Sequence, residues 1–365
     1  MGRALLSYAA MDEVASSAHP DPVAVVDDLR FDAHHDGSGH HPECPERLAA
    51  AREGLSLGLG QAARHAVPPR EITAGELARV HSPHYVARLQ ARLGNGYGQL
   101  DPDTYFSPGT REAAWLAAGG VVDMAQGLVA GTYKRGVALL RPPGHHAVPA
   151  ASMGFCLLNN VALAASAALA QGLTRVAIVD WDVHHGNGTQ DMFYQDANVL
   201  FTSLHQYPFY PGTGAPSEIG CDGGTGYTAN LALPADSGPE TYGAAFREVV
   251  LPMLRQYQPE LVLVSAGFDA HQRDPLASMN LDRQTYGALA SSLLDLVDSL
   301  GHGRIGFVLE GGYDLYALSD SVQEVARAML GTRTELPFGR LHSRERQAIE
   351  HTRQHLAPHW ELPLS

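Results

Sequence analysis

Short apolar runs alternate with longer amphipathic or Ala-rich stretches through most of the chain. Continuous apolar runs of this length are typical of strands buried on both faces, and the stretches between them have the length and composition of helices. We predict strands at 136–140, 175–180, 199–204, 261–265 and 305–309, and helices at 47–57, 160–170, 242–257 and 286–300. This alternation predicts an α/β fold with a parallel sheet covered by helices on both faces.

The organisation of the chain favours one domain. Its composition does not change sharply between residues 50 and 330, and it has no internal repeat or low-complexity tract. We predict a single domain over 1–365, with its core at about 20–330 and a helical tail at about 335–365. The first residues resemble a strand more than a signal peptide.

Residues 18–46 are rich in His, Pro, Asp and Gly and predict a long loop. This loop contains His34, His35, His40 and His41. We interpret it as solvated rather than metal-binding, because no carboxylate–histidine spacing there resembles a ligand pair on a strand or helix. The role of the 34–41 segment stays open.

Composition narrows the class of protein. A formal net charge of −14 argues against broad nucleic-acid binding. No apolar run approaches the ~18–20 residues that span a bilayer, so we expect no membrane partner. Three cysteines make a disulfide framework improbable, and a reduced cytoplasmic compartment fits best. The oligomeric state is not readable, which leaves a dimer or a tetramer open.

Residues 176–190 are the most informative stretch. The apolar run at 176–179 leads directly into Asp180, Asp182, His184 and His185, followed by turn-forming glycines. Side chains at i, i+2 and i+4 of a strand share a face, so Asp180, Asp182 and His184 could converge. Two carboxylates and an imidazole at the end of a buried strand indicate a cation site more than a polar loop.

The other predicted strands also end in polar groups, and open parallel sheets place their sites at this edge. Asp269 follows the strand at 261–265 and is either a helix N-cap or a metal ligand. With Asp182 and His184 it would complete a three-ligand site that leaves one position open for water and substrate, as catalytic zinc requires.

Three further residues are candidates for acid–base chemistry. His145 and His146 follow a Pro-Pro-Gly turn and could act as general base and acid, with Asp180 and Asn187 available to orient the rings. Tyr313 follows two glycines at the end of the strand at 305–309, where its hydroxyl could donate to an oxyanion.

Five motifs occur in a fixed order: 141–147 (RPPGHHA), 154–156 (GFC), 180–190 (DWDVHHGNGTQ), 267–269 (GFD) and 310–313 (EGGY). Together they resemble the zinc-dependent histone deacetylase family, in particular class II enzymes and bacterial histone-deacetylase-like amidohydrolases. The resemblance covers roughly residues 20–330. It implies an arginase-like domain around a parallel eight-stranded sheet. It also implies an amidohydrolase that removes acetyl or other short acyl groups from the ε-amine of lysine by attack of a metal-bound water.

The resemblance assigns catalytic roles residue by residue. Asp182, His184 and Asp269 are the implied zinc ligands. His146 is the implied general base, and His145, paired with Asp180, is the implied electrostatic support and proton donor. Asn187 stands beside His146 where class I enzymes carry an aspartate, which should leave His146 less basic. Tyr313 is the implied oxyanion donor.

The resemblance also implies two potassium sites. The inner site would use backbone carbonyls of Asp180, Asp182, His184 and Leu204 and the side chain of Ser203. The outer site would involve Phe193, Val199 and Tyr227.

The implied substrate site has tunnel walls at Gly154, Phe155 and Tyr210, and Asp103 at the rim. The family usually carries Phe where this chain has Tyr210. Polyamine deacetylases carry a glutamate gatekeeper where this chain has Leu276, and an apolar rim cannot select a second cationic amine. The residues therefore favour an acylated lysine peptide or protein over a small acylated amine.

Three other readings stay open. The nearest is a deacetylase of acetylpolyamines or other small acetylated amines. A binuclear manganese ureohydrolase shares the fold but needs bridging aspartates that this pattern does not supply. A catalytically dead acyl-lysine binding module is the third, although His146 and Tyr313 are both present.

Overall fold

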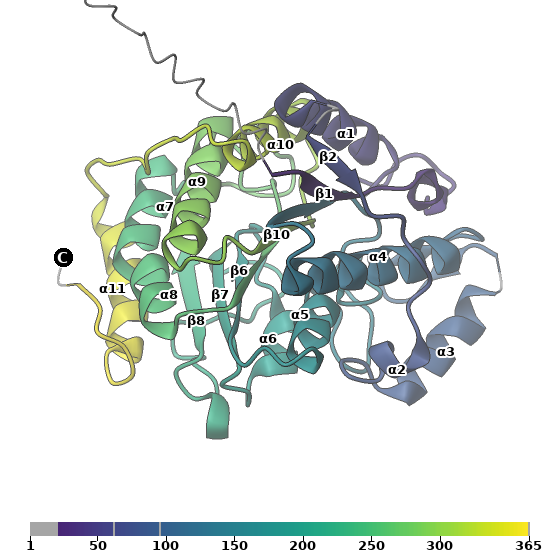
Figure 1. Ribbon diagram of the computed structural model, residues 1–365, viewed down its shortest axis with the longest axis horizontal. Helices are drawn as coiled ribbons and strands as arrows, with labels where there is room; N and C mark the ends of the chain where they lie inside the picture. The colour runs from purple at the N-terminus through teal and green to yellow at the C-terminus, as the bar shows by residue number, and fades with distance from the viewer. Residues whose placement is uncertain (1–20, 61–62, 95, 364–365) are drawn as a thin grey trace, which may run out of the picture.

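A computed structural model describes residues 21–60, 63–94 and 96–363. Eight strands form one sheet: β1 (Val23–Val26), β2 (Arg64–Ala66), β5 (Arg135–Ala138), β6 (Val176–Asp180), β7 (Val199–Gln206), β8 (Thr228–Leu233), β9 (Leu261–Ala266) and β10 (Ile305–Leu309). Their order is β2-β1-β5-β10-β9-β6-β7-β8, and every neighbouring pair is parallel. The sheet runs through the middle of the molecule with helices on both sides (Figure 1). This confirms the predicted α/β fold and its eight-stranded parallel sheet.

The five predicted strands are present as β5, β6, β7, β9 and β10, while β1, β2 and β8 are additional. The carboxyl edge of the sheet is therefore built largely from strands that the apolar pattern identifies. β10 is the last strand in the part of the chain that the structure describes, yet it lies in the interior of the sheet between β5 and β9.

Long helices cover the two faces of the sheet. α4 (Thr110–Ala130) and α5 (Asn160–Ala170) pack together against the strands, and α1 (Glu46–Leu59), α9 (Arg283–Ser299) and α10 (Leu315–Met329) form a second layer (Figure 1). α1, α5 and α9 confirm three predicted helices. The predicted helix at 242–257 is continuous but mixed: α7 (Pro239–Ala245), a π-helical turn η3 (Phe246–Val250) and α8 (Leu251–Tyr257).

Shorter elements surround this core. They are η1 (Leu29–Ala33), α2 (Ala74–Leu77), α3 (Pro83–Leu93), β3 (Gly98–Gln99), β4 (Tyr105–Phe106), α6 (Asn187–Phe193), η2 (Asp222–Gly224) and α11 (Ser343–Leu356). β3 and β4 pair in an antiparallel hairpin outside the main sheet. α11 lies within the segment predicted as a helical tail.

The prediction of one long loop at 18–46 is wrong, because this segment contains β1 and η1. Val23–Val26 is a fully buried strand whose apolar run is only four residues long and is flanked by loop-type residues. The solvated interpretation is also wrong for His34, which is buried against Tyr105 and Thr110. The predicted strand at the extreme N-terminus lies outside the described residues.

The statement that no apolar run approaches the length of a membrane span is wrong for α4. This helix has 21 residues and a mean hydropathy of 1.3 over its most apolar window, so by length and composition alone it could cross a bilayer. However, 72% of that window is buried within the fold, and α4 packs against α5 and the strands. Its apolar character follows from this packing.

Candidate active site

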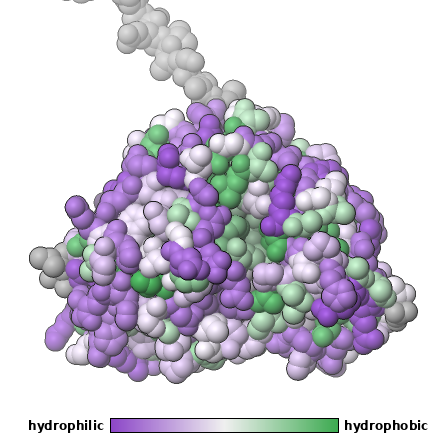
Figure 2. Space-filling model, turned by 90° about the horizontal axis from the view of Figure 1, so that it is seen from below, coloured by the Kyte–Doolittle hydropathy of each residue, from purple (hydrophilic) through white to green (hydrophobic). Residues whose placement is uncertain are grey.

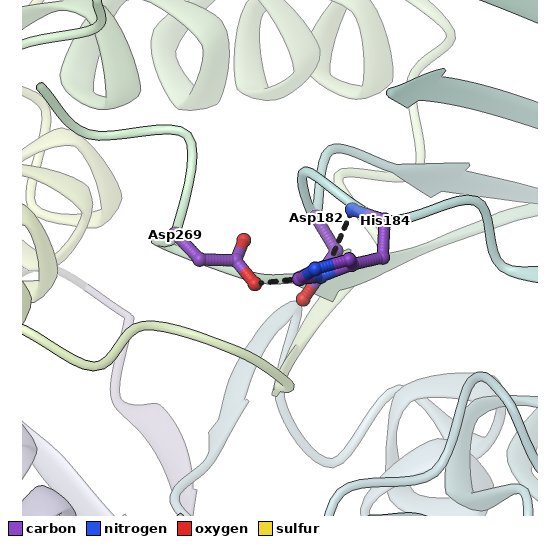
Figure 3. A group of neighbouring side chains, drawn as sticks. All are labelled: Asp182, His184 and Asp269. Carbon is purple, nitrogen blue, oxygen red and sulfur yellow. Dashed lines mark hydrogen bonds and ion pairs between the residues drawn. The ribbon is translucent and has the colours of Figure 1, made fainter. Parts of the chain in front are cut away.

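The chain segments that follow β5, β6, β9 and β10 meet at the carboxyl edge of the sheet. Asp182 and His184 come directly after β6, and Asp269 follows β9. Figure 3 shows the three side chains pointing toward one another from two separate segments. One ligand-type atom from each residue lies within 4.8 Å of those of the other two. The convergence predicted for Asp182, His184 and Asp269 is therefore present.

The geometry and charges of this triad fit a metal cation. His184 Nδ1 lies 3.2 Å from Asp182 Oδ1 and 3.2 Å from Asp269 Oδ2, and Asp269 Oδ2 is buried without a hydrogen-bond donor. Burial opposes a charged imidazole, but the two carboxylates outweigh it and raise the pKa of His184 to about 10. A positive charge would therefore stabilise the two carboxylates, and a divalent ion bound by one nitrogen and two oxygen ligands would supply it.

Two glycines leave the room that these carboxylates need. A Cβ at Gly267 would lie 2.1 Å from Asp182 Oδ2, and a Cβ at Gly311 would lie 2.1 Å from Asp269 Oδ2. The Gly311 N–H also donates to Asp182 Oδ2 at 2.8 Å. The strand-end glycines therefore allow the backbone to approach the triad closely enough to orient it.

His145 and His146 lie beside the triad in two different hydrogen-bonding environments. His145 Nδ1 is 2.9 Å from Asp180 Oδ2, and His146 Nδ1 is 2.8 Å from Asn187 Oδ1. Their ring centroids are 4.0 Å apart. Both predicted pairings, His145 with Asp180 and His146 with Asn187, are present.

The two imidazoles favour opposite protonation states. Burial opposes a charged His145, but Asp180 and Asp182 outweigh it and raise its pKa well above the usual value. Burial lowers the pKa of His146, and the neighbouring His145 and His184 lower it further. The opposite pKa shifts favour a proton on His145 and a neutral ring at His146, which is the arrangement of an acid–base pair.

A cavity of about 220 Å³ opens above these groups. The predicted site residues that line it are Asp103, His145, His146, Gly154, Phe155, His184, Tyr210, Leu276 and Tyr313. Pro143, Cys156, Phe209 and Gly311 line it as well, although they were not among the predicted site residues. Phe209 stacks on His184 with ring centroids 5.5 Å apart. The cavity therefore has two consecutive aromatic walls, where the sequence analysis named only Tyr210.

The rim and the walls are held together by backbone hydrogen bonds. Asp103 Oδ1 accepts from the Gly154 N–H at 3.1 Å, and Thr104 Oγ1 accepts from the Phe155 N–H at 3.0 Å. Asp103 thus lies at the cavity, as predicted, and it also anchors the 154–155 wall.

Tyr313 is held in place from two sides. Its N–H donates to Asp274 Oδ2 at 2.7 Å, and the Arg47 guanidinium lies 4.8 Å from its ring centroid. Arg47 Nε also donates to the Gly312 carbonyl at 2.6 Å. Burial raises the pKa of Tyr313 well above the usual value, so its hydroxyl stays protonated and can donate.

Arg47 belongs to a buried charge cluster behind the site that the sequence analysis missed. Glu43 accepts from Arg47 Nη1 at 2.9 Å and from Arg141 Nη2 at 2.7 Å, and it also contacts His34. The one sequence signal for this cluster was Arg141, which is the first residue of the RPPG motif. Nothing local in the sequence pairs it with Glu43, 98 residues away.

The residues of the predicted inner potassium site lie around the carboxyl end of β6, whereas Val199 and Tyr227 of the outer site lie where β7 and β8 begin. Both sites stay predictions. Asp180 of β6 is in register with Ser203 of β7, and Leu204 follows. Ser203 Oγ lies 2.9 Å from His205 Nδ1. At the outer site, Tyr227 accepts from the Phe201 N–H at 2.9 Å, while Phe193 ends α6 and Val199 begins β7.

Comparison with known proteins supports one family. Residues 41–329 match the model of the histone deacetylase domain. Histone deacetylase 15 of Arabidopsis thaliana is 42% identical over 300 residues, which cover 81% of this chain but 54% of that protein. A histone deacetylase-like amidohydrolase of Pseudomonas aeruginosa is 39% identical over 279 residues, covering 76% of this chain and 73% of the relative.

A third relative and a solved structure complete the comparison. The mouse protein named polyamine deacetylase HDAC10 is 41% identical over 311 residues, covering 80% of this chain and 45% of that protein. The crystal structure of the HDA15 HD domain superposes with a TM-score of 0.87 at 38% identity, covering 93% of this chain and 95% of that domain.

Proposed function

The chain belongs to the histone deacetylase domain family of hydrolytic deacetylases and has its fold, and on that premise we propose that it is a zinc-dependent deacylase of lysine side chains. The proposal rests chiefly on one observation: the Asp182, His184 and Asp269 triad lies at an apolar-walled cavity beside two histidines of opposite charge preference. Acetyl and other short acyl groups on the ε-amine are the proposed substrates.

Asp182, His184 and Asp269 would hold the zinc ion. When bound, zinc supplies Lewis-acid polarisation of the amide carbonyl and lowers the pKa of a water molecule. Burial of the triad favours such an ion, because two carboxylates left unpaired there would destabilise the fold.

The protein's own side chains would carry the proton transfers. His146, neutral and held by Asn187, would accept a proton from the attacking water. His145, kept protonated by Asp180, would stabilise negative charge and donate its own proton to the leaving amine. Tyr313 would donate a hydrogen bond to the carbonyl oxygen as it becomes an oxyanion.

Two monovalent cation sites are part of the proposal. The inner one would involve Asp180, Asp182, His184, Ser203 and Leu204, and the outer one Phe193, Val199 and Tyr227. Potassium is the proposed ion.

Leu276 supports lysine over polyamine as the substrate. It lies at the cavity and adds no negative charge that could hold a second amine. A polyamine deacetylase remains the second candidate, because a 41% identical relative carries that name. A ureohydrolase needs further bridging aspartates, and within the described residues the triad is the only cluster of three metal-type ligands.

Substrate choice gives the first test. An acetyl-lysine peptide should have a higher kcat/KM than acetylputrescine or N8-acetylspermidine. Leu276→Glu should shift the ratio toward the polyamines, because it adds a carboxylate at the rim. A wild-type preference for either polyamine would contradict the assignment.

Metal content gives the second test. The purified protein should contain about one zinc ion per chain, and a chelator should abolish an activity that added zinc restores. Asp269→Ala should lose both the metal and the activity, since it removes a ligand. Hydroxamates, which offer two oxygens to a metal, should inhibit. Unchanged activity in Asp269→Ala would rule out this site.

A further inference from the structure

A second cavity, of about 450 Å³, lies against α3 and away from the catalytic groups. We call it the basic pocket, and it is lined by Tyr85, Arg88, Leu89, Arg92, Gln99, Leu100, Ala151 and Ser152. Tyr85 and Leu89 are buried and form an apolar floor, while Arg88 and Arg92 are exposed. The two arginines are four residues apart on a helix, so their side chains lie on the same face.

The basic pocket and the catalytic cavity are separated by one wall. Leu100 and Ser152 line the basic pocket, whereas Asp103 and Phe155, a few residues further along the same two segments, line the catalytic cavity. The two segments are joined by hydrogen bonds from the N–H groups of Gly154 and Phe155. A ligand in the catalytic cavity would therefore have the basic pocket as its neighbour.

The two arginines of the basic pocket make a hydrogen bond and a ring contact rather than ion pairs. Among the described residues, neither Arg88 nor Arg92 takes part in an ion pair. Arg88 Nη2 donates to the Ala150 carbonyl at 3.1 Å, and the Arg92 guanidinium lies 5.5 Å from the Phe106 ring centroid. α3 contains no acidic residue, and the nearby Asp101 Oδ1 accepts from the N–H groups of Asp103 and Thr104.

Other described arginines also lack an ion pair, but Arg88 and Arg92 both line the basic pocket. Guanidinium groups bind carboxylates through paired hydrogen bonds, and their aliphatic stems pack on apolar floors such as Leu89. The chemistry of the basic pocket therefore fits an anionic group attached to a less polar chain.

We propose that the basic pocket binds the carboxylate of an Asp or Glu residue close in sequence to the acyl-lysine of a peptide substrate. The inference rests on the proposed lysine deacylase function and adds a sequence preference to it. An extended peptide advances about 3.3 Å per residue, so a carboxylate within about four residues of the lysine is within reach of a neighbouring pocket.

The test compares acetyl-lysine peptides that carry Glu or Gln at each position up to about four residues from the lysine. For the favoured position, wild type should turn over the Glu peptide with a kcat/KM about three to ten times that of the Gln peptide. The gain should be in KM, because binding at a remote pocket is equal in the ground and transition states. Added salt should reduce it.

Variants separate charge recognition from a general effect. Arg88→Gln with Arg92→Gln should bring the Glu-to-Gln ratio to about one, and Arg92→Glu should make a Lys peptide better than the Glu peptide at that position. Arg255→Gln with Arg340→Gln changes two exposed arginines outside the basic pocket, removes the same charge and should keep the wild-type ratio.

The outcomes distinguish this inference from the function on which it rests. A wild-type Glu-to-Gln ratio of one at every position would contradict carboxylate binding at the basic pocket and leave the deacylase function standing. A ratio above one that persists after loss of both arginines would do the same. No turnover of any acetyl-lysine peptide would overturn the deacylase function and the inference with it.

Discussion

Tyr313 combines a protonated hydroxyl with a ring held by Arg47 and a backbone N–H held by Asp274. Tyr313→Phe removes the hydroxyl and leaves both supports in place. Loss of one oxyanion donor typically lowers the rate by roughly 10²–10³, or about 2.7–4 kcal/mol. We expect the decrease mainly in kcat, because the charge develops only in the transition state. Steady-state kinetics, with zinc content and melting temperature as controls, measure it. A variant within about threefold of wild-type kcat would place oxyanion stabilisation elsewhere.

Gly311 tests how closely the backbone must approach the triad. In Gly311→Ala the new Cβ would lie 2.1 Å from Asp269 Oδ2 and 2.6 Å from Asp182 Oδ2, so both carboxylates must move. We expect metal content well below that of wild type and a loss of activity, because metal ligands tolerate displacements of only about 0.2 Å. Metal analysis after dialysis measures this. Full metal occupancy in the variant would show that the site tolerates the displacement.

At the scale of elements, α1 and α10 pack with backbone close to backbone. A Cβ at Gly54 of α1 would lie 2.1 Å from the Ser319 carbonyl oxygen of α10. We expect Gly54→Ala to lower the free energy of unfolding by about 1–3 kcal/mol, because overpacking outweighs the gain in helix propensity. Gly75→Ala in α2, where a Cβ meets nothing within 4 Å, is the matched control and should be neutral or slightly stabilising. Denaturant unfolding compares the two, and an equally stable Gly54→Ala would contradict the close packing.

The elements that carry the catalytic groups were predictable because parallel strands end at one edge, so residues far apart in the sequence converge there. Asp182 and Asp269 were identified on this ground. β8 was not predicted as a strand, because Thr228 and Asn230 interrupt its apolar pattern. Asn230 is nevertheless buried, because Nδ2 donates to Gln190 and to the Glu218 carbonyl. Such long-range polar partners leave no local signal.

The same limit applies to the supports of the site. Glu43 and Arg141 were not predicted as a pair, because buried ion pairs between distant segments have no sequence period. The basic pocket was not predicted either. In the sequence, Arg88 and Arg92 look like ordinary solvated residues of a helix, and only the fold places residues 99–100 and 151–152 beside them.

At the scale of the whole molecule, buried neutral histidines make stability depend on pH. Burial lowers the pKa of His34 to about 3 and that of His81 to about 4. Below the unfolded value of about 6.5 the unfolded chain binds protons at these positions that the folded chain does not. The free energy of unfolding should therefore fall as pH decreases from 6.5 toward 4, by up to about 1.4 kcal/mol per pH unit for each histidine.

His81→Gln should make this dependence shallower by up to about 1.4 kcal/mol per pH unit. His81 Nε2 accepts from the Asn159 N–H at 2.9 Å, and the glutamine oxygen offers a similar acceptor without titrating. Denaturant unfolding at a series of pH values measures the slope. His40→Gln, on the surface, is the control and should follow wild type. Parallel profiles for wild type and His81→Gln would show that His81 does not contribute.

The place of β10 has a consequence for how the protein is made. The ribosome releases β5 and β9 before residues 305–309, yet β10 is the strand that both of them pair with. Until it emerges, the nascent chain can form only two half-sheets, β2-β1-β5 and β9-β6-β7-β8, in which β5 and β9 are additional open edges. Open edges of this kind attract other strands, so the growing chain passes through a stage that is prone to aggregation and suited to chaperone binding. β10 closes both edges at once, and the residues that follow it bring Tyr313 to the site.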